Sequence, residues 1–305
     1  MVWYLESLTA PIIPNAPLQI KPKLAPAWGG SEAPPAAGGF RRGRGGLDGG
    51  HPAPAWAADV VSSNIVGYEK INLVAGLNMV AAQFVPVGSD ALEREISTIG
   101  TLDSSMAGYD DEYTYATEMR VWDATTRMYT TYGWAGTSPE TIDEMPELNN
   151  TWLDAGTEAT DDVLDTSAGV WIKAASAGTF TVSGEVPSEK TVSVPLVAGL
   201  NMIAYPYPAA VPVSTFGTLD SNMAGYDDEY TYATEMRVWN PNTRMYTTYG
   251  WAGTSPETID EMPELNNTWL DAGTEATEDT IPFGAAVWIK AATSGTITFS
   301  SPLAE

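Results

Sequence analysis

An internal repeat is the feature that most constrains the fold of this chain. Residues 100–160 recur as residues 217–277, and only positions 105, 123, 124 and 125 differ from their counterparts. Residues 74–79 likewise match residues 197–202, with a longer offset that indicates an insertion near residues 90–95 of the first copy. A period of this length corresponds to one whole domain per copy, since each copy can bury its own core. We therefore expect two modules of one fold, at residues 58–186 and 187–305.

The first 57 residues differ in kind from the repeat. They are rich in Pro, Gly and Ala and have no hydrophobic period, which predicts a disordered tail. The tail ends in Ala55-Trp56-Ala57, which has the small-x-small form of a signal-peptidase site, but the apolar stretch that a signal peptide needs is missing before it. We expect the mature chain to begin near Ala58 and the tail to be a non-native leader, with the native signal peptide not recognisable here.

Within each module the pattern is that of short strands. Apolar and polar residues alternate before the Val-Ala-Gly-Leu-Asn-Met segment, and residues 113–122 and 127–134 predict an aromatic hairpin. Its turn in the second copy is Asn240-Pro241-Asn242-Thr243, which suits a β-turn. One short helix is expected between Ser138, as N-cap, and Pro146. About seven strands per module predict an all-β protein, with each module a β-sandwich or a small open barrel.

Charge and composition exclude several classes of function. The net charge is −25, and because the tail has five basic against three acidic residues, residues 58–305 have a net charge of −27. Such a surface repels phosphate backbones and anionic lipid, so we expect no nucleic acid and no membrane insertion. The chain has no Cys, and its one histidine, His51, lies in the tail. The repeats therefore lack the residues of Ser-His-Asp triads, Cys-His pairs and ordinary zinc sites.

Two short motifs resemble those of a family of secreted proteins. Gly-Leu-Asn-Met followed by Val or Ile, then an aromatic hairpin, then Val-Trp-Ile-Lys before a Gly-Thr strand, occurs in both copies. This arrangement resembles uncharacterised β-rich repeat modules of secreted bacterial proteins, over residues 60–305. The resemblance implies an extracellular or cell-surface location, and it implies no catalytic residues.

Aromatic residues are the first candidate site. Each module has four tryptophans, at 122, 134, 152 and 171 and at 239, 251, 269 and 288. Core packing accounts for most such residues in small β domains. Trp134 and Trp251 come at a strand end in Tyr-Gly-Trp-Ala-Gly, so we predict that they are exposed and, with Tyr132 and Tyr249, form a platform for a surface glycan.

Acidic clusters are the second candidate site. They repeat beside Gly108 and Gly225, and calcium takes six to eight oxygen ligands, often from loop aspartates. The candidate calcium ligands are Asp103, Asp110, Asp111, Asp220, Asp227 and Asp228. The alternative, a solvated acidic face without a bound cofactor, is favoured because charge runs usually are solvated.

These observations predict a secreted or cell-surface structural or interaction protein with no catalytic activity, built from a duplicated β domain. Its partner is expected to be a surface glycan or another protein. Two alternatives stay open: a tandem pair of carbohydrate-binding modules, and a glycoside hydrolase that uses paired carboxylates.

Overall fold

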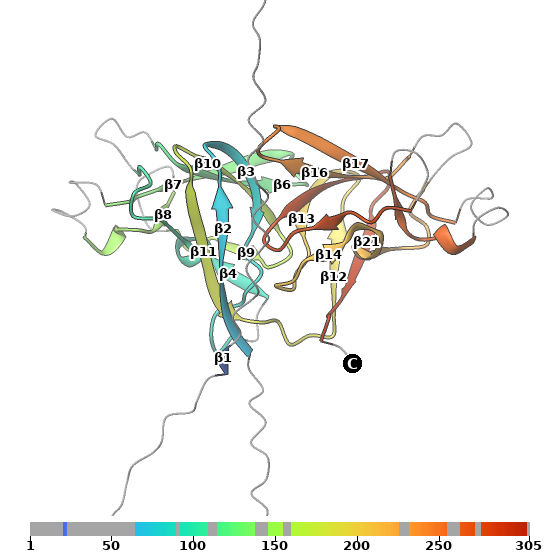
Figure 1. Ribbon diagram of the computed structural model, residues 1–305, viewed down its shortest axis with the longest axis horizontal. Coiled ribbons are helices and arrows are strands. Elements are labelled where there is room, and N and C mark those ends of the chain that lie inside the picture. The colour runs from blue at the N-terminus through green and yellow to red at the C-terminus, as the bar shows by residue number, and fades with distance from the viewer. Residues whose placement is uncertain are drawn as a thin grey trace, which may run out of the picture.

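The protein is all-β and is built from two modules of similar strand arrangement (Figure 1). The computed structural model describes residues 21–22, 65–89, 92–108, 115–137, 146–154, 160–225, 232–254, 263–271 and 276–303. The expected helix after Ser138 and almost all of the expected disordered tail lie outside these residues. Four 3-10 turns are present: η1 (Ile96–Thr98), η2 (Pro146–Leu148), η3 (Val213–Thr215) and η4 (Pro263–Leu265). The prediction of an all-β protein with duplicated modules is confirmed.

The first module has two main sheets. One has the order β1-β2-β11-β5 and the other the order β3-β10-β6-β7-β8, with β4 and β9 forming a separate pair. The strands are β1 (Lys21–Pro22), β2 (Ile65–Leu73), β3 (Gly76–Ala81), β4 (Glu93–Glu95), β5 (Thr101–Leu102), β6 (Glu118–Asp123), β7 (Met128–Trp134), β8 (Trp152–Leu153), β9 (Val163–Asp165), β10 (Gly169–Ala174) and β11 (Gly178–Glu185).

The second module repeats this arrangement. Its sheets have the orders β12-β21-β15 and β13-β20-β16-β17-β18, with β14 and β19 as the separate pair. The strands are β12 (Thr191–Leu196), β13 (Gly199–Ala204), β14 (Val211–Pro212), β15 (Thr218–Leu219), β16 (Glu235–Asn240), β17 (Met245–Trp251), β18 (Trp269–Leu270), β19 (Thr280–Ile281), β20 (Ala286–Ala291) and β21 (Gly295–Ser300).

The strand pairing refines where the first copy has extra residues. Arg94 of β4 pairs with Leu164, and Val211 of β14 pairs with Ile281. Both partners are related by the offset of the later repeat, so Glu93–Glu95 have counterparts in the second module. The extra residues of the first copy therefore precede Glu93. Residues 93–95 are not part of the insertion, contrary to the expectation that it covers residues near 90–95.

The two main sheets of each module pack face to face, as in a sandwich. In the first module the shared core contains Phe180 and Val182 from one sheet and Met119, Tyr132 and Ile172 from the other. The second module has the same kind of core, extended by the aromatic rings of Tyr205 and Tyr207. Of the two predicted architectures, the described strands fit the sandwich and form no closed barrel.

In the Gly-Leu-Asn-Met motif, a buried asparagine side chain holds a tight turn through its hydrogen bonds. Gly76 has φ 104°, a conformation that side chains disfavour, and it turns the chain from β2 into β3. Asn78 Oδ1 accepts a hydrogen bond from Val74 N (2.9 Å), and its Nδ2 donates to the carbonyls of Val74 (2.8 Å), Gly76 (3.0 Å) and Ile172 (3.3 Å). Asn201 repeats this pattern in the second module. The motif is therefore structural in both copies.

The predicted hairpin is confirmed, with a strand that begins later than expected. In β6 and β7, Trp122 lies opposite Tyr129 and Asp123 opposite Met128. Asp123 Oδ1 accepts a hydrogen bond from Thr125 N at the turn, and Arg127 closes the turn with φ 58°. In the second copy Asn240 takes the place of Asp123, and its Oδ1 accepts from the backbone of Asn242. Either side chain accepts the hydrogen bonds of the backbone N–H groups in this turn, which explains why the repeat tolerates change here.

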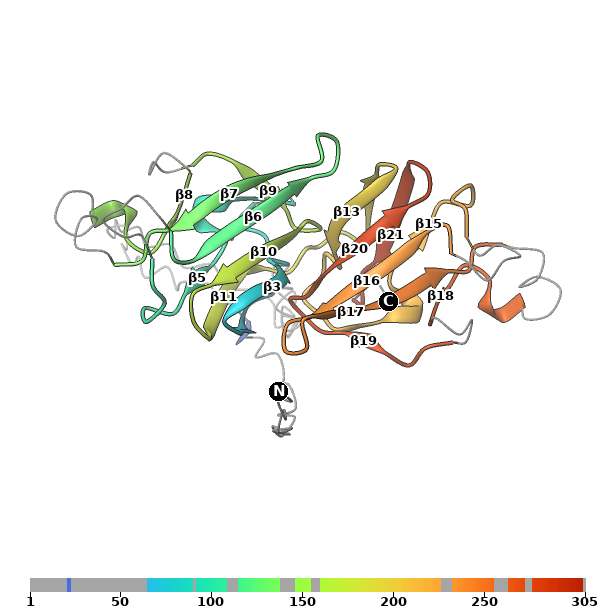
Figure 2. The ribbon, with the colours of Figure 1, turned by 90° about the horizontal axis from the view of Figure 1, so that it is seen from above.

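The modules contact each other through a third hydrophobic cluster, which we call the intermodule interface. It consists of Met79, Ala81 and Trp171 from the first module and Met202, Ala204, Ala286 and Trp288 from the second, with Trp122 and Trp239 at its margin. Figure 2 shows the two five-stranded sheets side by side, related by an approximate two-fold axis. The repeat alone gave no sign that the two copies would pack against each other in this way.

Candidate functional site

The four aromatic residues predicted to bind a glycan are buried in the module cores. Trp134 and Trp251 are 0% and 1% exposed, and Tyr132 and Tyr249 are 3% and 4% exposed. Trp134 packs on Trp152 with ring centroids 5.2 Å apart. The prediction that they are exposed is wrong, because side chains alternate along β7 and these residues point towards the core with Met119.

The tyrosines of that set have a structural role. Tyr132 donates its hydroxyl hydrogen to Asp162 Oδ2 at 2.6 Å, and Tyr249 does the same to Asp279 Oδ2 at 2.7 Å. Burial first, and then this hydrogen bond and the carboxylate charge, raise the pKa of both phenols well above the usual value. Both tyrosines therefore stay protonated and attach β7 and β17 to the segments that precede β9 and β19.

The predicted calcium ligands are only partly described by the structure. Asp103 Oδ2 accepts a hydrogen bond from Thr179 N at 2.8 Å, and its Oδ1 accepts from Thr179 Oγ1 at 2.7 Å. Asp220 takes the corresponding position in the second module, where its backbone N donates to Thr296 O. Asp110, Asp111, Asp227 and Asp228 lie outside the described residues. Within the described ranges no group of three or more acidic or histidine side chains is placed to hold a metal ion.

A different set of aromatic residues forms a surface across the intermodule interface. We call it the aromatic face: Trp122, Tyr129 and Trp171 with their counterparts Trp239, Tyr246 and Trp288. Along β6, β7 and β10 these side chains point away from the module core, opposite to Tyr132 and Trp134. Tyr129 and Tyr246 are 42% and 41% exposed, whereas Trp171 and Trp288 are buried at 7% and 6%, so the tyrosines are the members of the face most open to solvent.

The rings of the aromatic face contact one another across the interface. Trp122 meets Trp288 edge to face at 5.5 Å, and Trp239 meets Trp171 in the same way at 5.5 Å. Trp122 also packs on Tyr129 at 4.9 Å, as Trp239 does on Tyr246. Aromatic pairs favour such tilted contacts over stacked ones. These contacts form two equivalent groups of three rings, Tyr129–Trp122–Trp288 and Tyr246–Trp239–Trp171, and each group contains rings of both modules.

Two reciprocal hydrogen bonds fix this arrangement. Trp122 Nε1 donates to the carbonyl of Leu200 at 2.9 Å, and Trp239 Nε1 donates to the carbonyl of Leu77 at 3.0 Å. Backbone contacts add to them, because Ala81 N donates to Gly284 O and Ala204 N donates to Ser167 O. The indoles are thus both part of the surface and part of the interface that positions it.

The pKa of Tyr246 responds to groups of both modules. Burial raises this pKa, the hydrogen bond that the phenol oxygen accepts from Trp288 opposes the rise, and the phenol of Tyr129 adds to it electrostatically. Tyr129 belongs to the first module and Tyr246 to the second.

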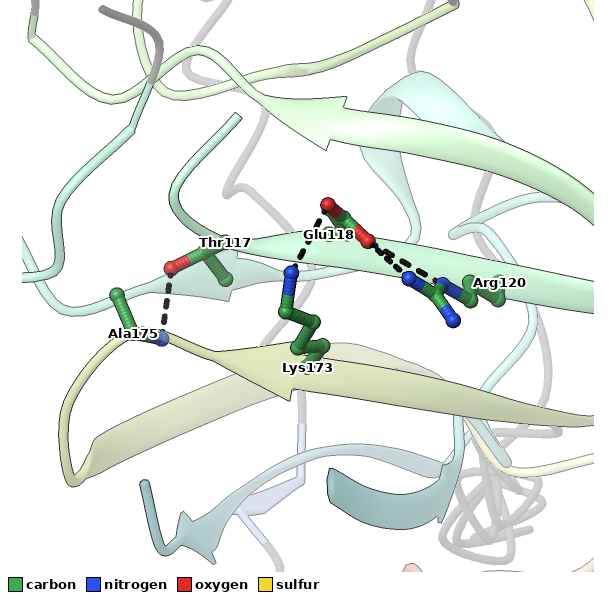
Figure 3. Close-up of polar contacts among 5 residues, drawn as sticks. All are labelled: Thr117, Glu118, Arg120, Lys173 and Ala175. Atoms are coloured by element: carbon green, nitrogen blue, oxygen red, sulfur yellow. Dashed lines mark hydrogen bonds and ion pairs between the residues drawn. The ribbon is translucent and has the colours of Figure 1, made fainter. Parts of the chain in front are cut away.

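Charged side chains border the aromatic face, and Figure 3 draws one group of them, around Glu118. Glu118 Oε2 accepts from Arg120 Nη2 at 2.6 Å, and its Oε1 accepts from Lys173 Nζ at 3.1 Å. Burial alone would raise the pKa of the Glu118 carboxyl, but the hydrogen bonds and charges of Arg120 and Lys173 outweigh burial and lower it. Glu235, Arg237 and Lys290 repeat the same group. Arg120 and Lys173 stay 39% and 45% exposed in their side chains, with donors left for a ligand.

A groove lies on one side of the intermodule interface. It has a volume of about 420 Å³ and is lined by Leu92, Trp122 and Ser167 of the first module and Val192 and Val194 of the second, among others. On the opposite side Ile71 lies against Gly284, where an added Cβ would come within 2.5 Å of its Cδ1, and Phe283 packs on the core of the first module. The two sides of the interface therefore differ, although the rings between them match.

No helix among the described residues is long and apolar enough to cross a membrane. Comparison of the chain with known protein families, with curated proteins and with solved structures finds no match.

Proposed function

We propose that this chain is a secreted or cell-surface structural or interaction protein, without catalytic activity, that binds its partner through the aromatic face. One observation supports this most directly. Of the large apolar side chains that are exposed in the described residues, four form two pairs on this face: Leu77 and Leu200, and Tyr129 and Tyr246. Exposed apolar groups that gather on one face are typical of an interaction site.

The composition of the surface agrees with a binding role. Tyr, Trp, Met and Arg are enriched in the centres of protein interfaces, and all four occur here in matched positions. The intermodule interface holds the two halves together, so a partner meets both at once. A second linked contact then adds affinity through effective concentration without any further residue types. The duplication is in this way explained by binding.

The test is binding of the full chain to intact cells of the source organism, detected through a C-terminal tag. We expect binding that is lost in the variant with Tyr129→Ala and Tyr246→Ala, since these rings are exposed and leave the core intact. Tyr68→Ala is the matched control, because Tyr68 is 50% exposed on β2, outside the face. Equal binding by all three proteins would remove the aromatic face from the proposal. Release of soluble products from the cell wall by the wild-type chain would contradict the absence of catalysis.

A further inference from the structure

Basic residues are concentrated on the aromatic face of a strongly acidic protein. Residues 58–305 have nine Lys and Arg, and six of them lie on the five-stranded sheets and their hairpin turns: Arg120, Arg127, Lys173, Arg237, Arg244 and Lys290. The acidic residues of the same strands and turns are Glu118, Asp123 and Glu235. The face therefore has an excess of three positive charges, while the modules as a whole have a net charge of −27.

The distribution of these charges follows the two-fold relation of the modules. Arg120 pairs in register with Thr131 and lies one step along the outer side of β6 from Trp122. Arg127, at the hairpin tip, extends over the second module, where an added Cβ on Gly199 would lie 3.7 Å from its Nη2, and Arg244 approaches Gly76 of the first module in the same way. Each hairpin tip thus extends a guanidinium group over the other module.

We propose that the aromatic face binds an acidic polysaccharide, and that one polysaccharide chain lies across the intermodule interface in contact with both modules. This inference rests on the binding role proposed above and names its ligand. The flat faces of pyranose rings are apolar and pack on exposed aromatic rings, which Tyr129 and Tyr246 supply. Carboxylate or sulfate groups at the rim of each sugar pair with guanidinium and ammonium groups, which Arg120, Lys173 and their counterparts supply. On the same side of β7 and β17, the exposed hydroxyls of Thr131 and Thr248 add hydrogen-bonding capacity.

Charge screening explains why so acidic a protein can bind an anion at this place. At physiological salt the Debye length is about 8 Å, so a ligand on the face responds to the nearby arginines and lysines more than to distant carboxylates. Each group of three rings crosses the interface, which favours a ligand long enough to contact both modules over two separate small ones. Phenols and threonine hydroxyls lie beside the charges and can bind the hydroxyl groups of a sugar. They favour a sugar polymer over an acidic peptide, whose carboxylates need only positive charge for binding.

The experiment is isothermal titration of the full chain with a short oligomer of galacturonic acid. We expect one oligomer per protein chain and an affinity that falls as sodium chloride is raised. Tyr129→Ala and Tyr246→Ala should each weaken binding by a similar factor, about threefold, and together by about tenfold, as expected for the loss of two aromatic contacts. Arg120→Gln with Arg237→Gln should weaken binding at low salt and much less at high salt.

Matched controls separate this site from general charge effects. Lys70→Gln with Lys190→Gln removes two exposed positive charges off the face, and Tyr68→Ala removes an exposed ring; neither should change the affinity by more than about twofold. A sulfated glucan titrated in parallel distinguishes sulfate from carboxylate as the preferred anion, and binding of either with the expected variants supports the proposal. Fully methyl-esterified oligogalacturonate, which lacks the charge, should not bind.

Three results would overturn the proposal. A stoichiometry of two oligomers per chain would show separate sites instead of one that crosses the interface. Poly-glutamate that binds as tightly as the sugar, with the same loss in the tyrosine variant, would assign the face to an acidic protein partner; the interaction role would then stand while the polysaccharide would not. Absence of binding by every anionic polysaccharide, with cell binding still sensitive to Tyr129→Ala and Tyr246→Ala, would reject the ligand alone.

Discussion

Gly169 and Ala286 occupy equivalent positions in the two modules and face each other across the intermodule interface. A Cβ added to Gly169 would lie 2.4 Å from the Cβ of Ala286 and 2.9 Å from Met202 Cγ. Non-bonded carbons pack at about 3.5–4.0 Å, so Gly169→Ala forces the modules apart or moves side chains out of their rotamers. Gly169 is not among the residues with positive φ, so the substitution changes packing without backbone strain.

The size of the effect follows from two contributions. Overpacking of a close-packed interior lowers the free energy of unfolding by about 1–3 kcal/mol. Alanine is less free than glycine in the unfolded chain, which offsets about 0.4–1 kcal/mol of this loss. We expect Gly169→Ala to lower the free energy of unfolding by about 1–2 kcal/mol. Ala286→Gly, which removes a methyl that is 1% exposed, should cost a similar amount. The double variant moves the methyl group to the other side of the same space, so it should lie within about 1 kcal/mol of the wild-type chain.

Urea unfolding followed by tryptophan fluorescence measures these differences, since Trp171 and Trp288 lie in the interface. The two modules need not unfold together, so the first transition is the one that reports on the interface. Strict additivity of the two single substitutions would refute the reasoning, because it would mean that the two positions do not share one space. Gly169→Ala with wild-type stability would refute it equally.

Three further predictions use the same preparation. Asn78→Ala should lower the free energy of unfolding by about 2–4 kcal/mol, since it leaves buried backbone groups without partners, and Asn201→Ala should do the same; a loss below about 1 kcal/mol would contradict the role of the motif. Burial raises the pKa of Glu69 from 4.5 to about 7, so the folded chain keeps the carboxyl proton to a higher pH than the unfolded chain does. The stability that comes from the protonated carboxyl is therefore lost as pH rises through about 7. Glu69→Gln should therefore raise the urea midpoint at pH 8 and leave it nearly unchanged at pH 5, and the reverse order would exclude burial as the cause. Calcium and magnesium at matched ionic strength should raise Tm equally, because Asp103 already accepts two hydrogen bonds from Thr179; a calcium-specific rise lost in Asp110→Asn with Asp227→Asn would show a site instead.

The strands were predictable because local pattern determines them. The hairpin of β6 and β7, the β10 strand and the β11 strand all appear close to where alternation and turn residues placed them. The turn at Asp123 and Asn240 was recognisable from its residue types alone. Strand starts were less accurate: β6 begins at Glu118, although the aromatic pattern begins earlier.

The candidate site was misplaced because a strand has two faces and both were aromatic. Tyr132 and Trp134 point into the core, while Tyr129 points outward and lies opposite Trp122. Gly133 shares the outward side of β7 with Tyr129, which is four positions away, and the ring of Tyr115 covers Gly133. The contact between the two copies had no local signal, since it depends on how whole sheets meet.

Gln83 shows what fusion of two copies into one chain permits. Its Nε2 donates to the carbonyl of Tyr205 and its Oε1 accepts from Gly284 N at 3.0 Å, so one side chain joins both modules. The matching position in the second module is Pro206, which has no side-chain donor or acceptor. In a dimer of identical subunits every substitution appears on both sides of the axis at once. Within a single polypeptide, each module can be substituted without the other. The two sides of the interface can therefore acquire different contacts while the tryptophans between them stay the same.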